Sequence, residues 1–347
     1  MVAATTRSVP EECIRLEDKE AGLDGFIVIH STARGPAAGG CRFWSYDTPE
    51  AAMVDAMRLA EGMSYKNASA ELPLGGGKAV LRRPAGEFDR RRLFEAFGRA
   101  VARLDGRYVT AEDVGTGLED MENIAHATRH VAGRTARPGF AGGDPSPWTA
   151  LGVFEAMKAA AAIRFGGSLA GARVAVQGVG NVGGRLARLL ADEGARLVLA
   201  DIDTQRAQAL ASELGAEVAS IADIAGVTAD VFAPCALGGA LDEAVLGVLK
   251  AALVCGAANN QLATPEIAEV LRARDILYAP DYVVNAGGII NVAAEYLGES
   301  EADVRGRVVA IGPRTAGILE MARAEGLTSA FVADREAEAK MRPLCVA

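Results

Sequence analysis

The chain has 347 residues and a formal net charge of −9, from 36 basic and 45 acidic side chains. This length suits about two domains with substantial cores. The charges are interspersed, which argues against a nucleic-acid-binding surface, and no apolar run approaches the ~18 residues of a membrane span. The N-terminal stretch MVAATTRSVPEEC has no apolar signal-peptide core. We therefore expect a soluble, cytoplasmic protein with no nucleic-acid partner and no membrane partner.

The cysteines and histidines suggest neither a disulfide framework nor a metal site. The five cysteines are far apart and form no CxxC pair, so we interpret them as buried free thiols. His126 and His130 have the spacing of a ligand pair on a predicted helix, but no HExxH motif surrounds them. We predict no metal site and interpret these histidines as surface or packing residues.

The first 45 residues predict strands and turns. Residues 25–30 (GFIVIH) predict a strand, and residues 35–40 (GPAAGG) predict a turn whose exposed backbone a ligand could approach closely. Apolar residues then recur at helical spacing from Pro49 to about Glu61. This helix delivers Lys66 near its C-terminal end.

Three successive glycines precede Lys78 in residues 74–81 (LGGGKAVL), and Lys78 is predicted to open a strand. A nucleotide-triphosphate loop requires Ser or Thr after the lysine and then a helix, whereas Ala79 and a strand follow here, so we exclude that function. The alternative is that the glycines let a small molecule lie against the backbone while Lys78 points at it. Asp113 follows a strand predicted at residues 107–110, and the end of a strand is a usual place for a catalytic side chain.

Residues 131–147 are rich in glycine and proline and predict an interdomain hinge. After a helix at residues 148–163, strands alternate with helices, which indicates a doubly wound parallel sheet. We predict an α/β protein of two domains with a cleft between them. The first domain covers residues 1–135 and the second, dinucleotide-binding domain covers residues 136–324. The helical residues 325–347 are expected to fold back on the first domain.

The stretch from Ala172 to Asp203 runs strand, glycine turn, helix, strand, acid. In this pattern Gly178 permits a tight turn, Gly180 lets the backbone approach a pyrophosphate, and Gly183 lets the helix pack on the strand. The helix start offers free N–H groups to the phosphates. Asp201 follows at roughly the 20-residue spacing expected of the acid that binds the ribose 2′-OH, and its charge favours NAD over NADP.

Seven blocks of the sequence resemble, in the same order, the amino acid dehydrogenases for glutamate, leucine, valine and phenylalanine. The resemblance covers nearly the whole chain and is closest to the shorter leucine, valine and phenylalanine branch. The blocks are Lys66, 75–78 (GGGK), 110–113 (TAED), 178–183 (GVGNVG), 232–236 (FAPCA), 258–261 (ANNQ) and 280–288 (PDYVVNAGG).

The resemblance implies reversible oxidative deamination of an apolar L-amino acid to the 2-oxo acid and ammonia with NAD. By it, Lys66 binds the substrate carboxylate, Lys78 activates the attacking water and Asp113 shuttles protons to and from the nitrogen. It also implies a homo-oligomer built through the first domain. Further implied contacts are Gly39, Gly40 and Asn259 for the substrate, and Thr149, Gly178, Gly180, Asn181, Val182, Gly183, Asp201, Ala236 and Asn259 for the cofactor.

The same chemistry can be argued from the residues themselves. Once hydride has left Cα, the imine needs a base that makes hydroxide from water. A lysine can serve when a second ammonium and desolvation favour its neutral form. Lys66 and Lys78 could supply that pair, with Asp113 limiting the total positive charge.

The evidence on the substrate side chain is divided. By the resemblance, Ala38, Ala111, Ile289 and Val292 line the pocket. Ala111, Gln261 and residues 289–292 are leucine-like, whereas Ala38 and residues 152–157 look more like phenylalanine enzymes, and Asp144 and Trp148 depart from the leucine pattern. We expect leucine-like substrates first and phenylalanine second, without glutamate activity because no basic residue is evident among these positions.

Two other functions compete with this one. A dehydrogenase of hydroxy acids would usually need a histidine or tyrosine as acid–base group, and no histidine lies in the seven blocks. A non-catalytic NAD-binding regulator would keep residues 178–183 and Asp201 but would not need Lys66, Lys78 and Asp113 together.

Overall fold

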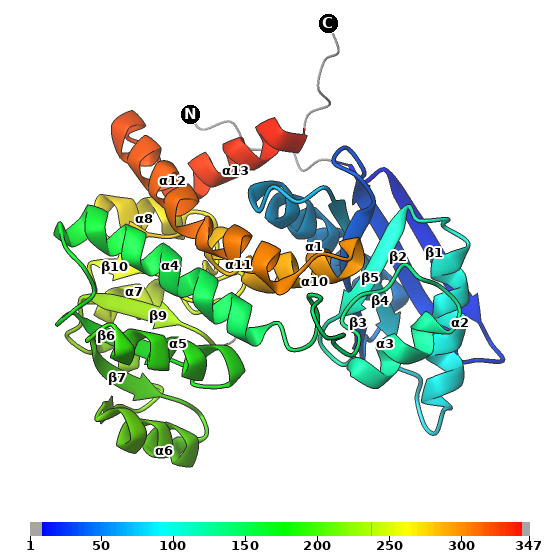
Figure 1. Cartoon of the computed structure of the whole chain (residues 1–347), viewed down its shortest axis with the longest axis horizontal. Helices are drawn as coiled ribbons and strands as arrows, with labels where there is room; N and C mark the ends of the chain where they lie inside the picture. Colours follow the sequence, from blue (N-terminus) through cyan, green and yellow to red (C-terminus); the bar gives the residue numbers. More distant parts are fainter. Residues whose placement is uncertain (1–8, 237, 342–347) are drawn as a thin grey trace, which may run out of the picture. The chain divides into compact units, whose positions relative to one another are not determined.

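The computed structural model describes residues 9–236 and 238–341 (Figure 1). The described chain divides into two compact units. Unit 1 comprises residues 9–143, 292–301 and 337–341, and unit 2 comprises residues 144–291 and 302–336. No helix among the described residues is long and apolar enough to cross a membrane.

Unit 1 is built on a five-stranded mixed sheet with the order β1-β2-β4-β3-β5. β2 pairs antiparallel with β1 and β4, whereas β3 pairs parallel with β4 and β5. Because β3, β4 and β5 run in the same direction, side chains near their carboxyl ends approach one another at one edge of the sheet. The strands are β1 Glu12–Asp18, β2 Leu23–Ser31, β3 Ala37–Trp44, β4 Gly75–Arg82 and β5 Tyr108–Glu112.

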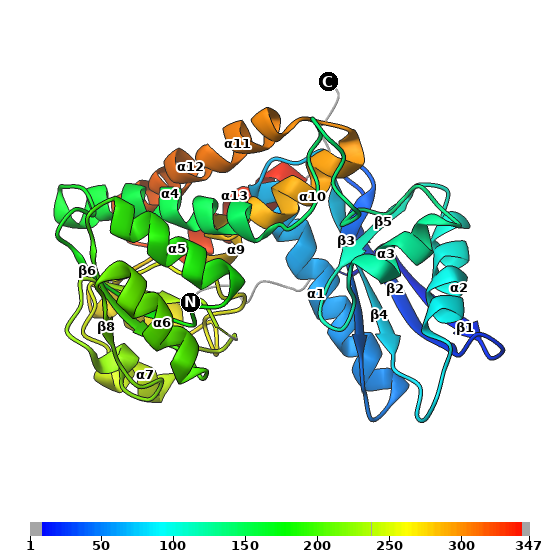
Figure 2. The same ribbon diagram turned by 60° about the horizontal axis from the view of Figure 1, so that its bottom comes forward.

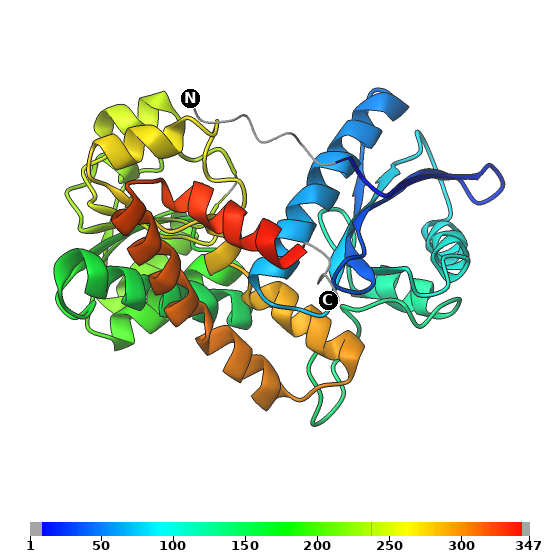
Figure 3. The same cartoon turned by 90° about the horizontal axis from the view of Figure 1, so that it is seen from above.

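Helices cover both faces of this sheet, as Figures 2 and 3 show. α1 (Pro49–Ser69) packs small residues such as Ala56 against Val28 and Val80 on one face. α2 (Arg90–Ala102) and α3 (Leu118–Ala125) bury a larger apolar core against the other face. The start of α1 is fixed locally, since Thr48 caps the helix through the N–H of Ala51.

The glycine clusters of unit 1 lie in strands, which corrects two sequence interpretations. β3 begins at Ala37 and therefore contains most of the predicted turn, and the three glycines before Lys78 are part of β4. A Cβ on Gly39 would lie 1.8 Å from the Gly77 carbonyl oxygen, and one on Gly76 would lie 2.1 Å from Ser64 Oγ. The glycines permit neighbouring backbones to approach closely, a requirement that sequence alone cannot distinguish from a turn.

β1 lies in the first 45 residues, where the sequence predicts strands and turns without individual bounds for this strand. Two smaller expectations fail in this unit. α3 ends at Ala125, so His126 and His130 do not share a helix. Cys13 is exposed rather than buried, while Cys345 lies outside the described residues.

Unit 2 contains a six-stranded parallel sheet with the order β11-β10-β9-β6-β7-β8. The chain runs outward from β6 to β8, returns to β9 beside β6, and runs outward again to β11. This confirms the predicted α/β fold with a doubly wound sheet, and its switch point lies between β6 and β9. The strands are β6 Arg173–Gln177, β7 Arg196–Ala200, β8 Glu217–Val218, β9 Val231–Pro234, β10 Leu253–Val254 and β11 Leu277–Tyr278.

Helices connect these strands and bury their apolar faces against the sheet, with Phe232, Val254 and Leu271 in one core cluster. α10 and α13 each begin in unit 2 and end in unit 1. The helices are α4 Ser146–Phe165, α5 Asn181–Asp192, α6 Thr204–Leu214, η1 Ile224–Gly226, α7 Glu243–Val248, α8 Ile267–Ala273, α9 Asp281–Val284, α10 Gly287–Leu297, α11 Glu301–Val309, α12 Ile311–Glu325 and α13 Ser329–Met341.

Candidate active site

Unit 1 brings together Lys78 and Asp113, which the sequence singled out separately. Lys78 lies within β4 and is 5% exposed, and Asp113 directly follows β5. Lys78 Nζ donates to Asp113 Oδ2 at 2.7 Å. The pair is thus a charge-assisted hydrogen bond between a buried ammonium and a carboxylate at a strand end.

A third charged group, Arg42 of β3, contacts the same carboxylate oxygen. Arg42 Nε lies 3.2 Å from Asp113 Oδ2, and Arg42 Nη1 lies 2.9 Å from Asp55 Oδ2. The sequence analysis missed Arg42. The parallel pairing of β3 with β5, which sets Cys41 opposite Glu112, is what brings Arg42 beside Asp113.

The electrostatics of Asp113 reflect these contacts. Burial alone would raise the pKa of Asp113, but the charge and hydrogen bond of Lys78, followed by the charge of Arg42, outweigh it and leave this pKa below its ordinary value. Burial first, and then the Asp113 charge, raise the pKa of the Cys41 thiol well above its ordinary value. Asp113 is therefore ionised and Cys41 neutral near pH 7.

Lys66 lies in the last turn of α1 and is partly buried. The neighbouring Asn67 fastens this turn to the sheet, because its Nδ2 donates to Gly75 O at 2.6 Å and to Ala38 O at 3.3 Å. The end of α1 is thereby held against β4 and β3 beside the glycines that precede Lys78.

The residues predicted to contact the substrate in unit 1 are packed against the same strands. The Gly39 carbonyl accepts a hydrogen bond from Tyr108 Oη at 2.8 Å, and a Cβ on Gly40 would lie 2.8 Å from Asp113 Cβ. Ala38 and Ala111 are buried at 4% and 6% exposure. Of the other two predicted pocket residues, Ile289 lies in unit 2 and Val292 in unit 1, both partly buried on α10.

Unit 2 gives the three glycines of the dinucleotide motif different surroundings. Gly178 has a φ of +91°, the left-handed conformation of the tight turn. A Cβ on Gly183 would lie 1.9 Å from the Gly178 carbonyl oxygen, so this position requires glycine for packing. A Cβ on Gly180 would have no neighbour within 4 Å. Open backbone at Gly180 is what close approach of a pyrophosphate requires.

A cavity of about 730 Å³ adjoins this turn. α5 begins at Asn181, so its free N–H groups lie at the cavity, where they favour a phosphate. This combination of open glycine, helix start and cavity fits a dinucleotide. Among the lining residues are Val179, Gly180, Asn181, Arg185, Arg188 and Arg206.

Asp201 follows β7 beside the glycine turn and is 7% exposed. Its carboxylate accepts two backbone hydrogen bonds, from Val179 N at 2.8 Å and from Asp203 N at 2.9 Å. Arg206 Nη1 lies 3.6 Å from its Oδ1. The acid predicted to bind the ribose therefore also stabilises the turn, a role that the spacing did not indicate.

The remaining predicted cofactor residues occupy separate positions in unit 2. Thr149 lies in the first turn of α4 and donates to Pro145 O at 3.2 Å. Asn259 accepts a hydrogen bond from Asn285 Nδ2 at 2.9 Å. Ala236 follows β9, and a Cβ on Gly178 would lie 2.9 Å from its Cβ, so Ala236 abuts the glycine turn at the switch point. Val182 lies in the first turn of α5.

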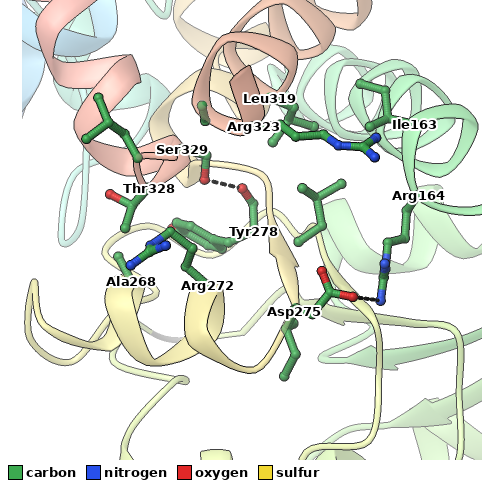
Figure 4. A pocket seen from close by; sticks show the side chains of 14 residues that line it. Ile163, Arg164, Ala268, Arg272, Asp275, Tyr278, Leu319, Arg323, Thr328 and Ser329 are labelled. Atoms are coloured by element: carbon green, nitrogen blue, oxygen red, sulfur yellow. Dashed lines mark hydrogen bonds and ion pairs between the residues drawn. The ribbon is translucent and has the colours of Figure 1, made fainter. Parts of the chain in front are cut away.

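Another cavity of unit 2, of about 390 Å³, lies between the ends of several helices and β11 (Figure 4). Arg164 pairs with Asp275 at 3.0 Å at its rim, and Ser329 Oγ donates to Tyr278 O at 2.5 Å. None of the predicted site residues lines it. It is therefore separate from the candidate active site.

Comparison with known proteins finds matches over most of the chain. The family model for the Glu/Leu/Phe/Val dehydrogenase dimerisation domain matches residues 10–130, and that for glutamate/leucine/phenylalanine/valine dehydrogenase matches residues 144–205 and 199–307. A leucine dehydrogenase of Thermoactinomyces intermedius is 45% identical over 333 residues, 95% of this chain and 90% of the relative. A valine dehydrogenase of Streptomyces virginiae is 45% identical over 336 residues, 95% and 93% of the two chains.

A solved structure gives the same result. The crystal structure of L-tryptophan dehydrogenase from Nostoc punctiforme matches with a TM-score of 0.85 at 38% identity and covers 96% of each chain. These matches confirm the resemblance carried by the seven sequence blocks. The chain belongs to the Glu/Leu/Phe/Val dehydrogenase family of amino acid dehydrogenases.

Proposed function

We propose that this protein catalyses the NAD-dependent, reversible oxidative deamination of apolar L-amino acids to 2-oxo acids and ammonia. The observation that carries the proposal is the pair formed by the buried Lys78 and Asp113, with Nζ 2.7 Å from Oδ2. A regulator that only bound NAD would have no need of a buried ammonium paired with a carboxylate. A dehydrogenase of hydroxy acids would need a different acid–base group.

The residues of unit 1 supply binding and proton transfer. The ammonium of Lys66 binds the substrate carboxylate, and Gly39 and Gly40 of β3 contribute backbone contacts to the substrate. A bound nicotinamide would supply the acceptor for the hydride of Cα, and the substrate would be left as an imine. Once Lys78 has passed its proton to Asp113 and is a neutral amine, it takes a proton from water as the water oxygen attacks the imine carbon. Asp113 carries protons to and from the nitrogen, and ammonia then leaves as the carbonyl forms.

The balance of this reaction is one amino acid, one water and NAD⁺ in, and one 2-oxo acid, ammonium, NADH and a proton out. Direct contact between Nζ of Lys78 and Oδ2 of Asp113 supports a proton relay, because a proton can pass along a 2.7 Å hydrogen bond. Asp113 is ionised at the start, since its pKa is held below the ordinary value, and it can therefore accept a proton.

We propose NAD as the preferred cofactor, held by residues 178–183, Asp201, Thr149, Ala236 and Asn259. Support comes from the buried carboxylate of Asp201, which would repel a 2′-phosphate and accept a hydrogen bond from a ribose hydroxyl. The cation of Arg206, 3.6 Å from Asp201, reduces the repulsion of a 2′-phosphate, but the Asp201 carboxylate still accepts the hydrogen bond from the ribose.

For the substrate side chain we propose leucine and valine first. The relatives named leucine dehydrogenase and valine dehydrogenase, each 45% identical, support this order. Phenylalanine is the second candidate, because Ala38 leaves room in the predicted pocket. The L-tryptophan dehydrogenase of similar structure adds a larger aromatic substrate to those that a test must include.

The test is NADH formation at alkaline pH with L-leucine, L-valine, L-phenylalanine, L-tryptophan, L-glutamate and lactate. We expect the highest kcat/KM with leucine or valine and no signal with glutamate or lactate. A signal with lactate alone would overturn the proposal, and so would no signal with any amino acid. We also propose a homo-oligomer formed through unit 1, supported by the dimerisation-domain description of the matching family model; light scattering tests it.

A further inference from the structure

Arg42 links the Lys78–Asp113 pair to helix α1. It lies on β3 with a side chain 22% exposed, and its guanidinium contacts Asp113 Oδ2 through Nε and Asp55 Oδ2 through Nη1. Asp55 belongs to α1. One planar cation therefore joins two carboxylates from different elements.

The far end of this link is itself fixed. Asp55 Oδ2 also accepts a hydrogen bond from Tyr46 Oη at 2.6 Å, and Asp55 Oδ1 pairs with Arg58 at 2.8 Å. Arg42 is thus held at its outer end by a carboxylate whose own position is determined by two further side chains. Its inner end meets the oxygen of Asp113 that Lys78 contacts.

We propose that Arg42 is a positioning residue that holds the Asp113 carboxylate on the Lys78 ammonium and contributes to the charge balance of that pair. This inference rests on the proposed function, which gives Lys78 and Asp113 their proton-transfer roles. The guanidinium suits the task because its N–H groups have a fixed planar arrangement and its charge is permanent.

Lys78 of β4 and Arg42 of β3 are the two cations that contact the Asp113 carboxylate. The Val114 N–H lowers the pKa of Asp113 further, whereas Cys41 and Tyr108 belong to the core on the α2 and α3 face of the sheet and interact only with the Asp113 charge. Burial raises the pKa of both Cys41 and Tyr108, so both stay neutral over the working range. Without Arg42, the carboxylate would keep Lys78 but lose the second cation that fixes its orientation.

The experiment compares Arg42→Gln, Arg42→Lys and a matched control, Arg58→Gln, in the full-length protein. Arg58→Gln removes a neighbouring cation that pairs with Asp55, whereas Asp113 pairs with Lys78 and Arg42. For each variant, kcat, KM, the pH profile of kcat/KM and the thermal midpoint are measured with the amino acid that the parent enzyme oxidises best.

For Arg42→Gln we expect kcat to fall by about 10- to 100-fold with little change in KM, since a slight misplacement of a reacting group costs about this much. We expect protonation of Asp113 to set the acid limb of the profile, because the ionised carboxylate is the proton acceptor. The charge of Arg42 lowers the pKa of Asp113, so its removal should move this limb to higher pH. Arg42→Lys restores the charge and should return the limb to the parent position with kcat only partly recovered. Arg58→Gln leaves Tyr46 and Arg42 on Asp55, so its loss in kcat should be much smaller than that of Arg42→Gln and its acid limb should not move.

Parent-like kcat and an unmoved limb in Arg42→Gln would overturn the inference. Equal losses in Arg42→Gln and Arg58→Gln, or a lower thermal midpoint with an unmoved limb, would also overturn it, because either result indicates a merely structural role. If Arg42→Gln does not fold, the test rests on Arg42→Lys. A kcat equal to that of the parent enzyme would then contradict the positioning role of Arg42. A reduced kcat with the acid limb at the parent position would support it. A parent enzyme inactive on every amino acid would instead overturn the proposed function, and the inference with it.

Discussion

Nζ of Lys78 lies 2.7 Å from Oδ2 of Asp113, although Lys78 lies in β4 and Asp113 directly follows β5 of the unit 1 sheet. This hydrogen bond joins the proposed base to the proposed proton carrier. It also explains how a lysine that is 5% exposed can be accommodated, because a buried ammonium needs a charged or hydrogen-bonding partner.

Replacing Lys78 by Ala should abolish turnover and leave NADH binding nearly unchanged, because the predicted cofactor residues lie in unit 2. The loss in kcat should be at least the 10²–10⁴-fold typical of general acid–base groups. Steady-state kinetics and the fluorescence of bound NADH measure the two effects. Activity within tenfold of the parent would exclude Lys78 as the base.

Replacing Asp201 by Ser should weaken NADH binding and shift the preference toward NADPH. Loss of a charge-assisted hydrogen bond costs ~1.5–3 kcal/mol, or about 10- to 150-fold in affinity. The dissociation constants of NADH and NADPH are measured by fluorescence titration. Asp203→Asn is the control for the loss of a negative charge near the turn. It removes the Asp203 charge, while Asn can still cap α6. An unchanged NADH-to-NADPH ratio in Asp201→Ser would show that this carboxylate does not contact the ribose.

The glycines of the dinucleotide turn should respond differently to the same added methyl group. Gly180→Ala should fold normally, since its Cβ meets open space, but bind NADH more weakly because the methyl group occupies the approach of the pyrophosphate. Gly183→Ala should lose stability or soluble expression, because its Cβ would lie 1.9 Å from a carbonyl oxygen. Thermal midpoints and NADH affinities measure both. Equal behaviour of the two variants would contradict the assigned roles.

Gly76→Ala should destabilise unit 1 and lower activity, because its Cβ would lie 2.2 Å from the Ser64 backbone nitrogen and push α1 off β4. Gly62 lies in α1, and a Cβ there would have no neighbour within 4 Å. Gly62→Ala should therefore stabilise the protein by about 0.5–1 kcal/mol. Urea denaturation compares the two. A neutral Gly76→Ala would mean that α1 does not depend on this close approach.

Replacing Ala38 by Leu should reduce activity on phenylalanine more than on valine, because the added carbons narrow the predicted pocket. A methylene misfit costs ~1–3 kcal/mol, so the phenylalanine-to-valine ratio of kcat/KM should fall by roughly tenfold or more. Ala38 is 4% exposed, so overpacking should also cost ~1–3 kcal/mol of stability. Ala38→Gly should not lower the ratio. A ratio that Ala38→Leu leaves unchanged or raises would place Ala38 outside the pocket.

The features predicted best from sequence are those that depend on neighbouring residues along the chain. The strand, glycine turn, helix and acid from Ala172 to Asp203 form one continuous segment, and the structure has β6, α5 and β7 there. Local chemistry also indicated Lys66, Lys78 and Asp113, because each stands at an element end or beside glycines. The alternation of strands and helices was enough for the doubly wound sheet.

Pairings between distant strands required the tertiary structure. The glycines at Gly39 and Gly76 look like turn residues in sequence, yet they lie in strands, because the partner that excludes a Cβ comes from another element. The link from Asp55 through Arg42 to Asp113 joins α1, β3 and the end of β5, and no spacing along the chain encodes it. The sequence by itself determined which side chains could do the chemistry. Only the parallel register of β3, β4 and β5 decided which of them touch, because strand pairing sets distances that separation along the chain does not.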